Sequence, residues 1–352
     1  MPAPSRPPHP HPLPPAGYPR VEASCGVFPR VADRAIQWGR GDQSPAPSPA
    51  VRERAGGEGP GLRRRSRVAH AAPATSDAET PSRAAEREQI GRREDGVTFW
   101  DGKVAIVTGA GGGIGRAAAL LFVERGARVV IADLKEDGGR ETVELAGGSG
   151  HASFVRTDTT SVDDVAALID AAVGAFGRVD ALINNAAIIE RFDRIEDEPV
   201  DRFRRVIDIN LSGLFICSKA AVPHLRAQGG GVIVNMSSMG AVGGANILAY
   251  SSAKAGVLAL TRGLSQQLAA DNIRVNAIMP GLVETPMTVD GPAIARARRE
   301  QLPVFRPEEM ARAVAYAAEH EELTGALLQY LHTPEGPRFA MMEPWTWEPL
   351  EL

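Results

Sequence analysis

Tyr250 and Lys254 have the residue types and the spacing that proton transfer requires. They lie four positions apart at the start of a predicted helix over residues 249–269, which places both side chains on one face of that helix. A free tyrosine has a pKa of about 10, so only about one in a thousand is ionised at pH 7. A lysine cation beside the phenol lowers that pKa and makes the tyrosine a usable proton donor or acceptor. A surface pair is the alternative interpretation when this spacing stands alone.

Two serines lie upstream of that helix. Ser237 and Ser238 follow the apolar run 232–235, which predicts a buried strand that ends beside them. If the strand end and the helix start meet above one sheet, a serine hydroxyl there can hydrogen-bond the carbonyl oxygen of a substrate. Ordinary turn chemistry is the alternative explanation for two adjacent serines.

The octet 108–115, Thr-Gly-Ala-Gly-Gly-Gly-Ile-Gly, directly follows the apolar run 104–107. This order predicts a buried strand, a glycine-rich turn and a helix that begins at about Gly113. Glycine lets a ligand approach the backbone, and the unpaired N–H groups of a helix N-terminus attract a pyrophosphate. The sequence therefore predicts a nucleotide site, with Gly109, Gly113, Ile114 and Gly115 as its first candidate residues.

Asp133 ends the next predicted strand and favours NAD over NADP. It lies 18 residues after Gly115, where a carboxylate can accept hydrogen bonds from the adenosine ribose hydroxyls. The same carboxylate repels a 2′-phosphate by on the order of 4 kcal/mol, for charges about 4 Å apart at an effective dielectric near 20. Two nearby cations, Arg116 and Lys135, argue in the opposite direction, and a simple turn is the alternative role for Asp133.

Other candidate cofactor contacts lie just past predicted strands. Asn185 and Ala186 follow the strand 180–183, where small residues let backbone approach a cofactor and amides can tie neighbouring strands together. Asp158 follows the strand 152–156 and can meet the adenine edge, with a turn or cap as the alternative. The segment that closes the strand 273–278 can line the nicotinamide end through Pro280, Gly281, Val283 and Thr285.

The elements that position these residues form an alternating pattern of apolar strands and helices. Because the strands are apolar throughout rather than alternating, they predict a parallel sheet buried on both faces. We expect a Rossmann-type doubly wound α/β fold of about seven strands, with ligands at the strands' carboxyl ends. The predicted strands are 104–107, 128–132, 152–156, 180–183, 232–235, 273–278 and 326–331, and the predicted helices are 113–125, 136–145, 161–176, 201–226, 249–269 and 308–319.

Taken together, these motifs resemble the classical, single-domain type of the short-chain dehydrogenase/reductase family. The likeness covers about residues 99–331 and includes Asn210 within the predicted helix 201–226. It implies a catalytic set of Asn210, a serine, Tyr250 and Lys254. By that resemblance Tyr250 carries the proton, Lys254 holds the nicotinamide ribose and lowers the tyrosine pKa, and the serine steadies the substrate oxygen. Asn210 would support a water relay, and hydride would pass between the nicotinamide and a carbinol or carbonyl carbon.

The chain departs from the family pattern at three places. Ala187 stands where the family has glycine, and the usual Asp-Gly-Gly after the last strand is absent. The catalytic serine is ambiguous, because counting back thirteen residues from Tyr250 gives Ser237 whereas strand register from Asn235 gives Ser238. We prefer Ser238, since a one-residue slip along a strand turns a side chain to the other face. The C-terminal region often helps to build tetramers in this family, so its departure leaves the assembly open.

Composition divides the chain into three parts. Residues 1–97 hold 16 of the 27 prolines and 15 arginines against 11 acidic residues, and they predict a disordered Pro/Arg-rich extension. A basic address segment, an organelle transit peptide and a start codon further downstream are the alternatives. We expect the NAD-binding domain over 98–335 and a tail over 336–352, whose aromatic residues pack on the body or a neighbour, or cover the active site.

The same composition restricts the partners. From residue 98 onward the chain has 24 Lys and Arg against 32 Asp and Glu, which argues against nucleic-acid binding. Cys25 and Cys217 have no metal-ligand spacing, so we expect no metal site and a reducing, cytoplasmic setting. No apolar stretch of 18 residues was found, so no membrane span is expected. A homodimer or homotetramer is the expected assembly.

The leading hypothesis is an NAD-dependent oxidoreductase that interconverts a secondary alcohol and a ketone. A 3-oxoacyl-thioester reductase is the first alternative, and a catalytically idle NAD-binding module is the second. Substrate specificity is assigned to residues 246–248 and 287–303. The second stretch includes Arg296, Arg298 and Arg299, for which we prefer a solvated helix face over an anion site.

Overall fold

The computed structural model describes residues 98–333 and 336–342. The predicted extension over 1–97, with Cys25, and the aromatic residues after 342 lie outside the described residues. The strands are β1 (Val104–Thr108), β2 (Arg128–Asp133), β3 (Ala152–Arg156), β4 (Ala181–Asn184), β5 (Gly231–Met236), β6 (Ile273–Met279), β7 (Leu327–Thr333) and β8 (Gly336–Met341). The helices are α2 (Gly113–Glu124), α3 (Glu136–Leu145), α4 (Val162–Phe176), α5 (Val200–Ile207), α6 (Gly213–Ala227), α7 (Leu248–Gln267), α8 (Pro292–Glu300) and α9 (Pro307–Glu319).

The predicted doubly wound α/β fold is confirmed. One sheet has the order β3-β2-β1-β4-β5-β6-β7-β8, and β1 to β7 run parallel. Strand order reverses at β1, which lies between β2 and β4, so the chain leaves β1 toward one edge and later returns to its other side. The carboxyl ends of β1 and β4 therefore border the crevice in which this architecture binds ligands.

The sheet has eight strands rather than the expected seven. β8 pairs antiparallel with β7, with Tyr330 opposite Phe339. The Phe339 ring stacks on Tyr316 of α9 at a centroid distance of 4.2 Å and meets Tyr330 edge-on at 5.3 Å. The sequence analysis did not expect this strand, because it lies in the segment predicted as a tail.

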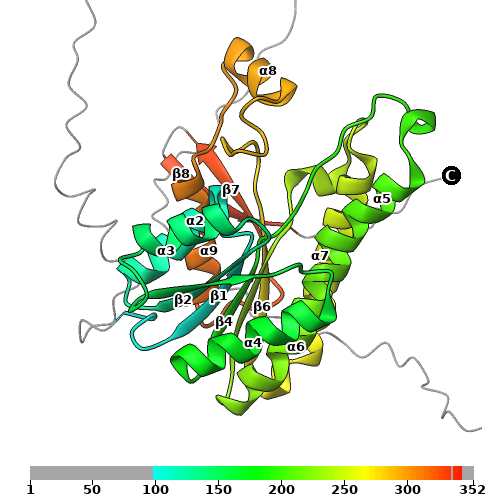
Figure 1. Ribbon diagram of the computed structural model, residues 1–352. Helices are drawn as coiled ribbons and strands as arrows, with labels where there is room; N and C mark the ends of the chain where they lie inside the picture. The colour runs from blue at the N-terminus through cyan, green and yellow to red at the C-terminus, as the bar shows by residue number, and fades with distance from the viewer. Residues whose placement is uncertain (1–97, 334–335, 343–352) are drawn as a thin grey trace, which may run out of the picture. The chain divides into compact units, whose positions relative to one another are not determined.

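Helices cover both faces of the sheet (Figure 1). On one face α2 and α9 pack closely together, because buried alanines such as Ala118 and Ala315 allow the two backbones to approach. On the other face α4 and α6 cover β1, β4 and β5 through Leu168, Cys217 and Leu225. The strands between these layers are buried on both sides, as their continuous apolar runs predicted.

The predicted helix 201–226 is not regular. A π turn, η2 (Asp208–Ser212), separates α5 from α6. By composition and length the stretch Val200–Ala227 is also the one candidate for a membrane span among the described residues. Its buried residues Cys217, Ala221 and Leu225 pack on the sheet, so we interpret it as a covering helix of the domain.

Arg274 on β6 fixes the end of α9. Its guanidinium donates hydrogen bonds to carbonyl oxygens at and beyond the helix C-terminus, which are those of Ala317, Ala318, His320 and Leu323. Burial lowers the pKa of Arg274, and the nearby Glu321 and Glu322 oppose that shift. A buried cation thus satisfies carbonyls that have no partner within the helix.

Candidate active site

The glycine-rich turn after β1 has no room for side chains. A Cβ atom on Gly109 would lie 2.8 Å from the Cα atom of Ala186, and one on Gly115 would lie 2.5 Å from Asn185 Nδ2. Gly109 and Gly113 also have positive φ angles of 65° and 55°. The turn therefore needs glycine for its own conformation and for its contact with the segment after β4.

The N-terminus of α2 presents an uncompensated positive end to this turn. Its N-cap is Gly112, no side chain caps it, and its first turn has no acidic residue. Thr285 lies over it, because a Cβ on Gly113 would be 3.4 Å from the Thr285 Cβ. Free N–H groups and an open backbone beneath a covering segment fit the pyrophosphate of a dinucleotide.

Asp133 holds the turn in place. Its Oδ2 accepts a hydrogen bond of 2.8 Å from the N–H of Gly111, and its Oδ1 accepts one of 2.9 Å from the N–H of Lys135. Arg116 donates to the carbonyl oxygen of Gly111 at 2.7 Å and forms an ion pair with Glu141 at 2.5 Å. The charge of Arg116 is therefore committed, which weakens one of the two arguments for NADP.

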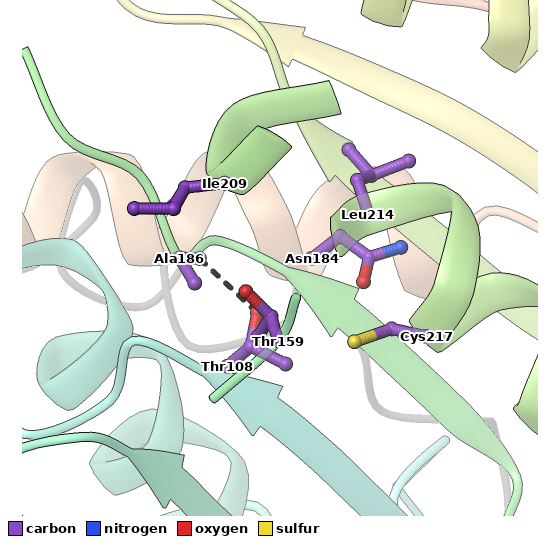
Figure 2. A pocket seen from close by; sticks show the side chains of 7 residues that line it. All are labelled: Thr108, Thr159, Asn184, Ala186, Ile209, Leu214 and Cys217. Carbon is purple, nitrogen blue, oxygen red and sulfur yellow. Dashed lines mark hydrogen bonds between the residues drawn. The ribbon is translucent and has the colours of Figure 1, made fainter. Parts of the chain in front are cut away.

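Asn185 and Ala186 connect the turn to β4. Asn185 Nδ2 donates to the carbonyl oxygens of Thr108 and Gly109 at 2.9 and 3.0 Å. The N–H of Ala186 donates to Thr108 Oγ1 at 3.1 Å (Figure 2). The small pocket beside these groups is also lined by the side chains of Thr159, Asn184, Ile209, Leu214 and Cys217. The predicted amide link between neighbouring strands is therefore present.

A buried amide chain beside this turn extends the predicted link between strands to the helix α7, which the sequence did not indicate. Asn184 Nδ2 donates to Asn235 Oδ1 at 2.9 Å, and Asn235 Nδ2 donates to Thr261 Oγ1 at 3.0 Å. All three residues are buried. Polar residues inside otherwise apolar strands were the available signal, since a buried amide needs a partner. The chain joins β4, β5 and α7, the elements that carry the site.

The structure places Ser238, and not Ser237, beside Tyr250. Ser237 is buried, and its hydroxyl donates to the carbonyl oxygen of Lys254 at 2.8 Å. Ser238 Oγ accepts a hydrogen bond of 3.0 Å from the N–H of Gly240, and the Ser238 side chain is close enough to the Tyr250 phenol to act on its pKa. Both residues flank Gly240. A Cβ atom added to Gly240 would lie 3.3 Å from Ser238 Oγ and 3.4 Å from Tyr250 Cε1. The register argument therefore identifies the serine that reaches the phenol.

Lys254 lies one helical turn after Tyr250 with its ammonium 5.7 Å from the centre of the phenol ring. Its Nζ donates to the carbonyl oxygen of Met236 at 2.6 Å, and burial lowers the pKa of Lys254 to about 8. Burial raises the pKa of Tyr250, while Ser238 and the charge of Arg191 oppose that shift. The net pKa of Tyr250 is therefore raised rather than lowered, because desolvation of the phenolate outweighs the effects of Ser238 and Arg191.

Asn210 lies in the π turn and is fully buried. Its Oδ1 accepts a hydrogen bond from the N–H of Ile188, and its Nδ2 donates to the carbonyl oxygen of the same residue, both at 2.8 Å. The turn packs on α7, where Leu211 touches Gly256. Asn210 thus ties the segment after β4 to the helix layer, and its side-chain amide is committed to that link.

A family model described as short chain dehydrogenase matches residues 103–293. The chain belongs to this family. It is an oxidoreductase of the type that acts on CH–OH groups and their carbonyl counterparts.

The dehydrogenase is similar to several curated proteins. It is 47% identical over 222 residues to cis-4-hydroxycyclohexanecarboxylate dehydrogenase of Sinomonas cyclohexanicum, covering 61% of this chain and 89% of that protein. It is 36% identical over 223 residues to cyclohexanol dehydrogenase of Acinetobacter sp. (strain SE19), covering 62% and 88%. A solved structure of 3-ketoacyl-(acyl-carrier-protein) reductase from Brucella melitensis, complexed with NADH, is 32% identical with a TM-score of 0.62, covering 65% and 96%.

The remaining predicted cofactor contacts of the dehydrogenase make different hydrogen bonds and packing contacts within the protein. Asp158 Oδ1 accepts hydrogen bonds from the N–H and the hydroxyl of Thr160 at 2.9 and 2.7 Å, so that oxygen holds a turn. The carbonyl oxygen of Pro280 accepts a bond of 2.9 Å from the N–H of Met239. Gly281 and Val283 both lie against Phe305. The segment 280–285 is therefore anchored above the crevice. Ile114 packs against the core cluster beneath α2.

The dehydrogenase has one charged residue near its phenol that the sequence analysis did not select. Arg191 follows β4 by seven positions, and its charge acts on Tyr250. A lone arginine after a strand forms no motif, so only folding shows its position. Among the described residues, no group of three His, Cys, Asp or Glu side chains could hold a metal ion.

Proposed function

We propose that this dehydrogenase uses NAD to interconvert a secondary alcohol carried on a ring and the corresponding ketone. The observation that carries the proposal is the meeting of Ser238 and Tyr250 at the carboxyl end of β5, beside the crevice under Thr285. Two curated relatives are named as dehydrogenases of cyclic alcohols, and these names support a substrate whose alcohol is carried on a ring.

The side chains divide the work as follows. The Ser238 hydroxyl holds the substrate oxygen, and the Tyr250 hydroxyl takes or gives the proton on that oxygen. Lys254, held by the Met236 carbonyl, places a cation one helical turn from the phenol. A bound nicotinamide supplies the hydride acceptor or donor. The Tyr250 phenol is protonated at neutral pH, so it is the group that gives the proton in ketone reduction.

Asp133 supports NAD rather than NADP. Its carboxylate lies at the turn that faces the adenosine ribose in this architecture, and the Arg116 charge beside it is committed to Glu141. The NADH in the solved relative is consistent with this preference. The site residues thus fit a dinucleotide without a 2′-phosphate.

The test of the activity compares wild type with Tyr250→Phe on cyclohexanol and NAD, following absorbance of the reduced cofactor. We expect turnover to fall by about 10²- to 10⁴-fold, the usual contribution of a general acid or base. Cofactor binding should remain, because the ring stays in place. Tyr316→Phe on α9 is the matched control and should retain activity. Undiminished turnover in Tyr250→Phe would overturn the proposed mechanism.

A 3-oxoacyl-thioester reductase is the second candidate, favoured by the name of the solved relative. Acetoacetyl-CoA with NADH and with NADPH separates the two. Faster reduction of the thioester than of cyclohexanone would favour this second function.

We further propose a homodimer or homotetramer in a reducing, cytoplasmic compartment. An apolar strip over η2, α6 and α7 supports the assembly, since Phe215 on it is 47% exposed. The unpaired, buried thiol of Cys217 supports the compartment, and burial raises its pKa to about 12, which keeps it protonated and unreactive.

A further inference from the structure

Arg191 is a half-buried cation that has no counter-ion among the described residues. Within the described part of the chain its guanidinium has no hydrogen bond and no ion pair. The adjacent carboxylate of Glu190 is taken by Arg202, at 2.9 Å. A partly desolvated charge left without a partner is costly, so it indicates a ligand of opposite charge.

The segment that carries Arg191 is fixed in place. The N–H of the next residue, Phe192, donates to the carbonyl oxygen of Asn246 at 3.1 Å, which joins the segment to the approach of α7. At its other end Asn210 holds Ile188 by two hydrogen bonds. Arg191 is therefore presented from a loop that is anchored on both sides.

The guanidinium lies beside the start of α8, and its charge acts on the catalytic phenol. Its Nη2 is 3.9 Å from the position of a Cβ on Gly291, which precedes α8. Its charge also acts on Tyr250. Arg191 thus borders the two stretches to which the sequence assigned specificity, 246–248 and 287–303.

Other arginines nearby are already engaged or exposed. Arg296 pairs with Glu300 on the same helix, and Arg298 pairs with Glu284. Arg299 is exposed on α8. These helix arginines were the candidates that the sequence offered for an anionic substrate, and the structure favours Arg191 over all three.

We propose that Arg191 binds a carboxylate of the substrate, so that the substrate is a ring alcohol or ketone bearing an acid group away from the reacting carbon. This inference rests on the proposed function. A guanidinium can bind a carboxylate with two parallel hydrogen bonds, which fixes both orientation and distance. With one end held at Arg191 and the carbinol oxygen at Ser238 and Tyr250, the ring would be oriented at two points.

The kinetic test uses the complete protein with NAD and three alcohols: cis-4-hydroxycyclohexanecarboxylate, its methyl ester and cyclohexanol. Wild type is compared with Arg191→Gln, Arg191→Lys and the control Arg299→Gln. We expect Arg191→Gln to lower kcat/KM for the acid relative to the ester by about ten- to a hundredfold, the usual worth of a charge-assisted bond. Arg191→Lys should recover part of this ratio, and Arg299→Gln should leave it unchanged. The ratio is the readout, because removing the charge also affects Tyr250 for every substrate.

A binding measurement separates this inference from the proposed reaction. Cyclohexanecarboxylate, which has no carbinol, is titrated calorimetrically into the NAD-saturated protein. Binding by wild type and its loss in Arg191→Gln would support the carboxylate site even if none of the alcohols is oxidised, in which case the proposed function alone fails. Failure of wild type to bind, equal affinity in both proteins, or an unchanged acid-to-ester ratio would overturn the role of Arg191.

Discussion

At the scale of single residues, the site depends on two groups whose pKa values burial shifts in opposite directions. Burial raises the pKa of the Tyr250 phenol and lowers the pKa of Lys254 to about 8. Both shifts favour the neutral form, because a low-dielectric surrounding penalises charge of either sign. The site is thus built around a protonated phenol and an ammonium that is close to its titration point.

The lowered pKa of Lys254 predicts a dependence of stability on pH. Free lysine has a pKa of 10.5, so between pH 8 and 10.5 the unfolded chain binds the proton more strongly than the folded one. The cost of folding around the charged amine is therefore full below pH 8 and disappears as pH rises to 10.5. Relative to Lys254→Met, wild type should gain roughly 3 kcal/mol across this window, at about 1.4 kcal/mol per pH unit.

Urea unfolding of both proteins at pH 7.5, 9 and 10 measures this gain. The comparison is made as a difference because the raised pKa of Cys217 acts in the opposite direction above pH 9 in both proteins. A difference between wild type and Lys254→Met that stays constant with pH would contradict the prediction.

Asp133 predicts the choice of cofactor. Asp133→Ser removes the carboxylate that opposes a 2′-phosphate, so the preference for NAD over NADP in kcat/KM should fall by at least tenfold. It also leaves Gly111 N–H with a weaker acceptor, so some loss of stability is expected. Exposed Asp137→Ser on α3 is the control. A preference unchanged from wild type would place the discrimination elsewhere.

Residue types alone indicated most of this chemistry. Tyr250, Lys254, Asp133 and the glycines of the turn stand at strand or helix ends where the pattern is strong, and strand register selected the serine that lies beside Tyr250. Arg191 could not be selected, since its importance arises only when α7 and α8 fold beside it. The direction of the tyrosine pKa was also missed, because spacing shows which charges are near but not how far water is excluded.

At the scale of elements, the π turn η2 is the feature that sequence periodicity did not predict. The apolar pattern of the sequence continues from α5 into α6. The one extra residue that a π turn contains, compared with an α-helical turn, changes this pattern little. The turn directs Asn210 toward Ile188, and asparagine's poor helix propensity was the single local sign. An irregular helix here serves to position the loop that carries Arg191.

Asn210→Ala tests that role. It leaves the N–H and the carbonyl of Ile188 without partners, so stability should fall by about 1–3 kcal/mol. We also expect KM for the substrate to rise more than kcat falls, because the loosened segment lies beside the substrate and the phenol stays in place. Ser212→Ala in the same turn is the control. Equal effects of both variants, by thermal unfolding and steady-state kinetics, would show that the tether has no special role.

At the scale of the whole described domain, one edge of the sheet is covered and one helix surface is left open. β8 covers the edge of β7, and its Phe339 joins Tyr316 and Tyr330. The apolar strip over η2, α6 and α7, which includes Phe215, is left exposed. The sequence predicted the parallel sheet and its helices because their patterns are local, whereas β8 depends on pairing and on aromatic contacts that no short window reveals.

Phe339→Ala measures what β8 contributes. The loss of a half-buried ring with two aromatic partners should lower the free energy of unfolding by about 2 kcal/mol, below the 3–5 kcal/mol typical of a fully buried phenylalanine. Met341→Ala, on the same strand and 54% exposed, should cost little. Similar midpoints of denaturation for Phe339→Ala and wild type would mean that the strand adds no stability.

Phe215→Glu tests the assembly. A charge in the centre of an apolar contact between copies should shift the protein from dimer or tetramer toward monomer, as measured by light scattering after size exclusion. Exposed Val242→Glu, which lies in the segment before α7, is the control. If wild type is itself monomeric, or Phe215→Glu keeps the wild-type mass, the strip is not the contact.

The guanidinium of Arg274 links the end of α9 to a strand that precedes it by more than 40 residues. An isolated α9 segment lacks this cap, so its last turn can become stable only after β6 has docked. This implies an order of assembly in which the central strands form first and α9 closes last. Pulse-labelling of amide hydrogens during refolding should show late protection in α9, and protection of α9 before β6 would reverse that order.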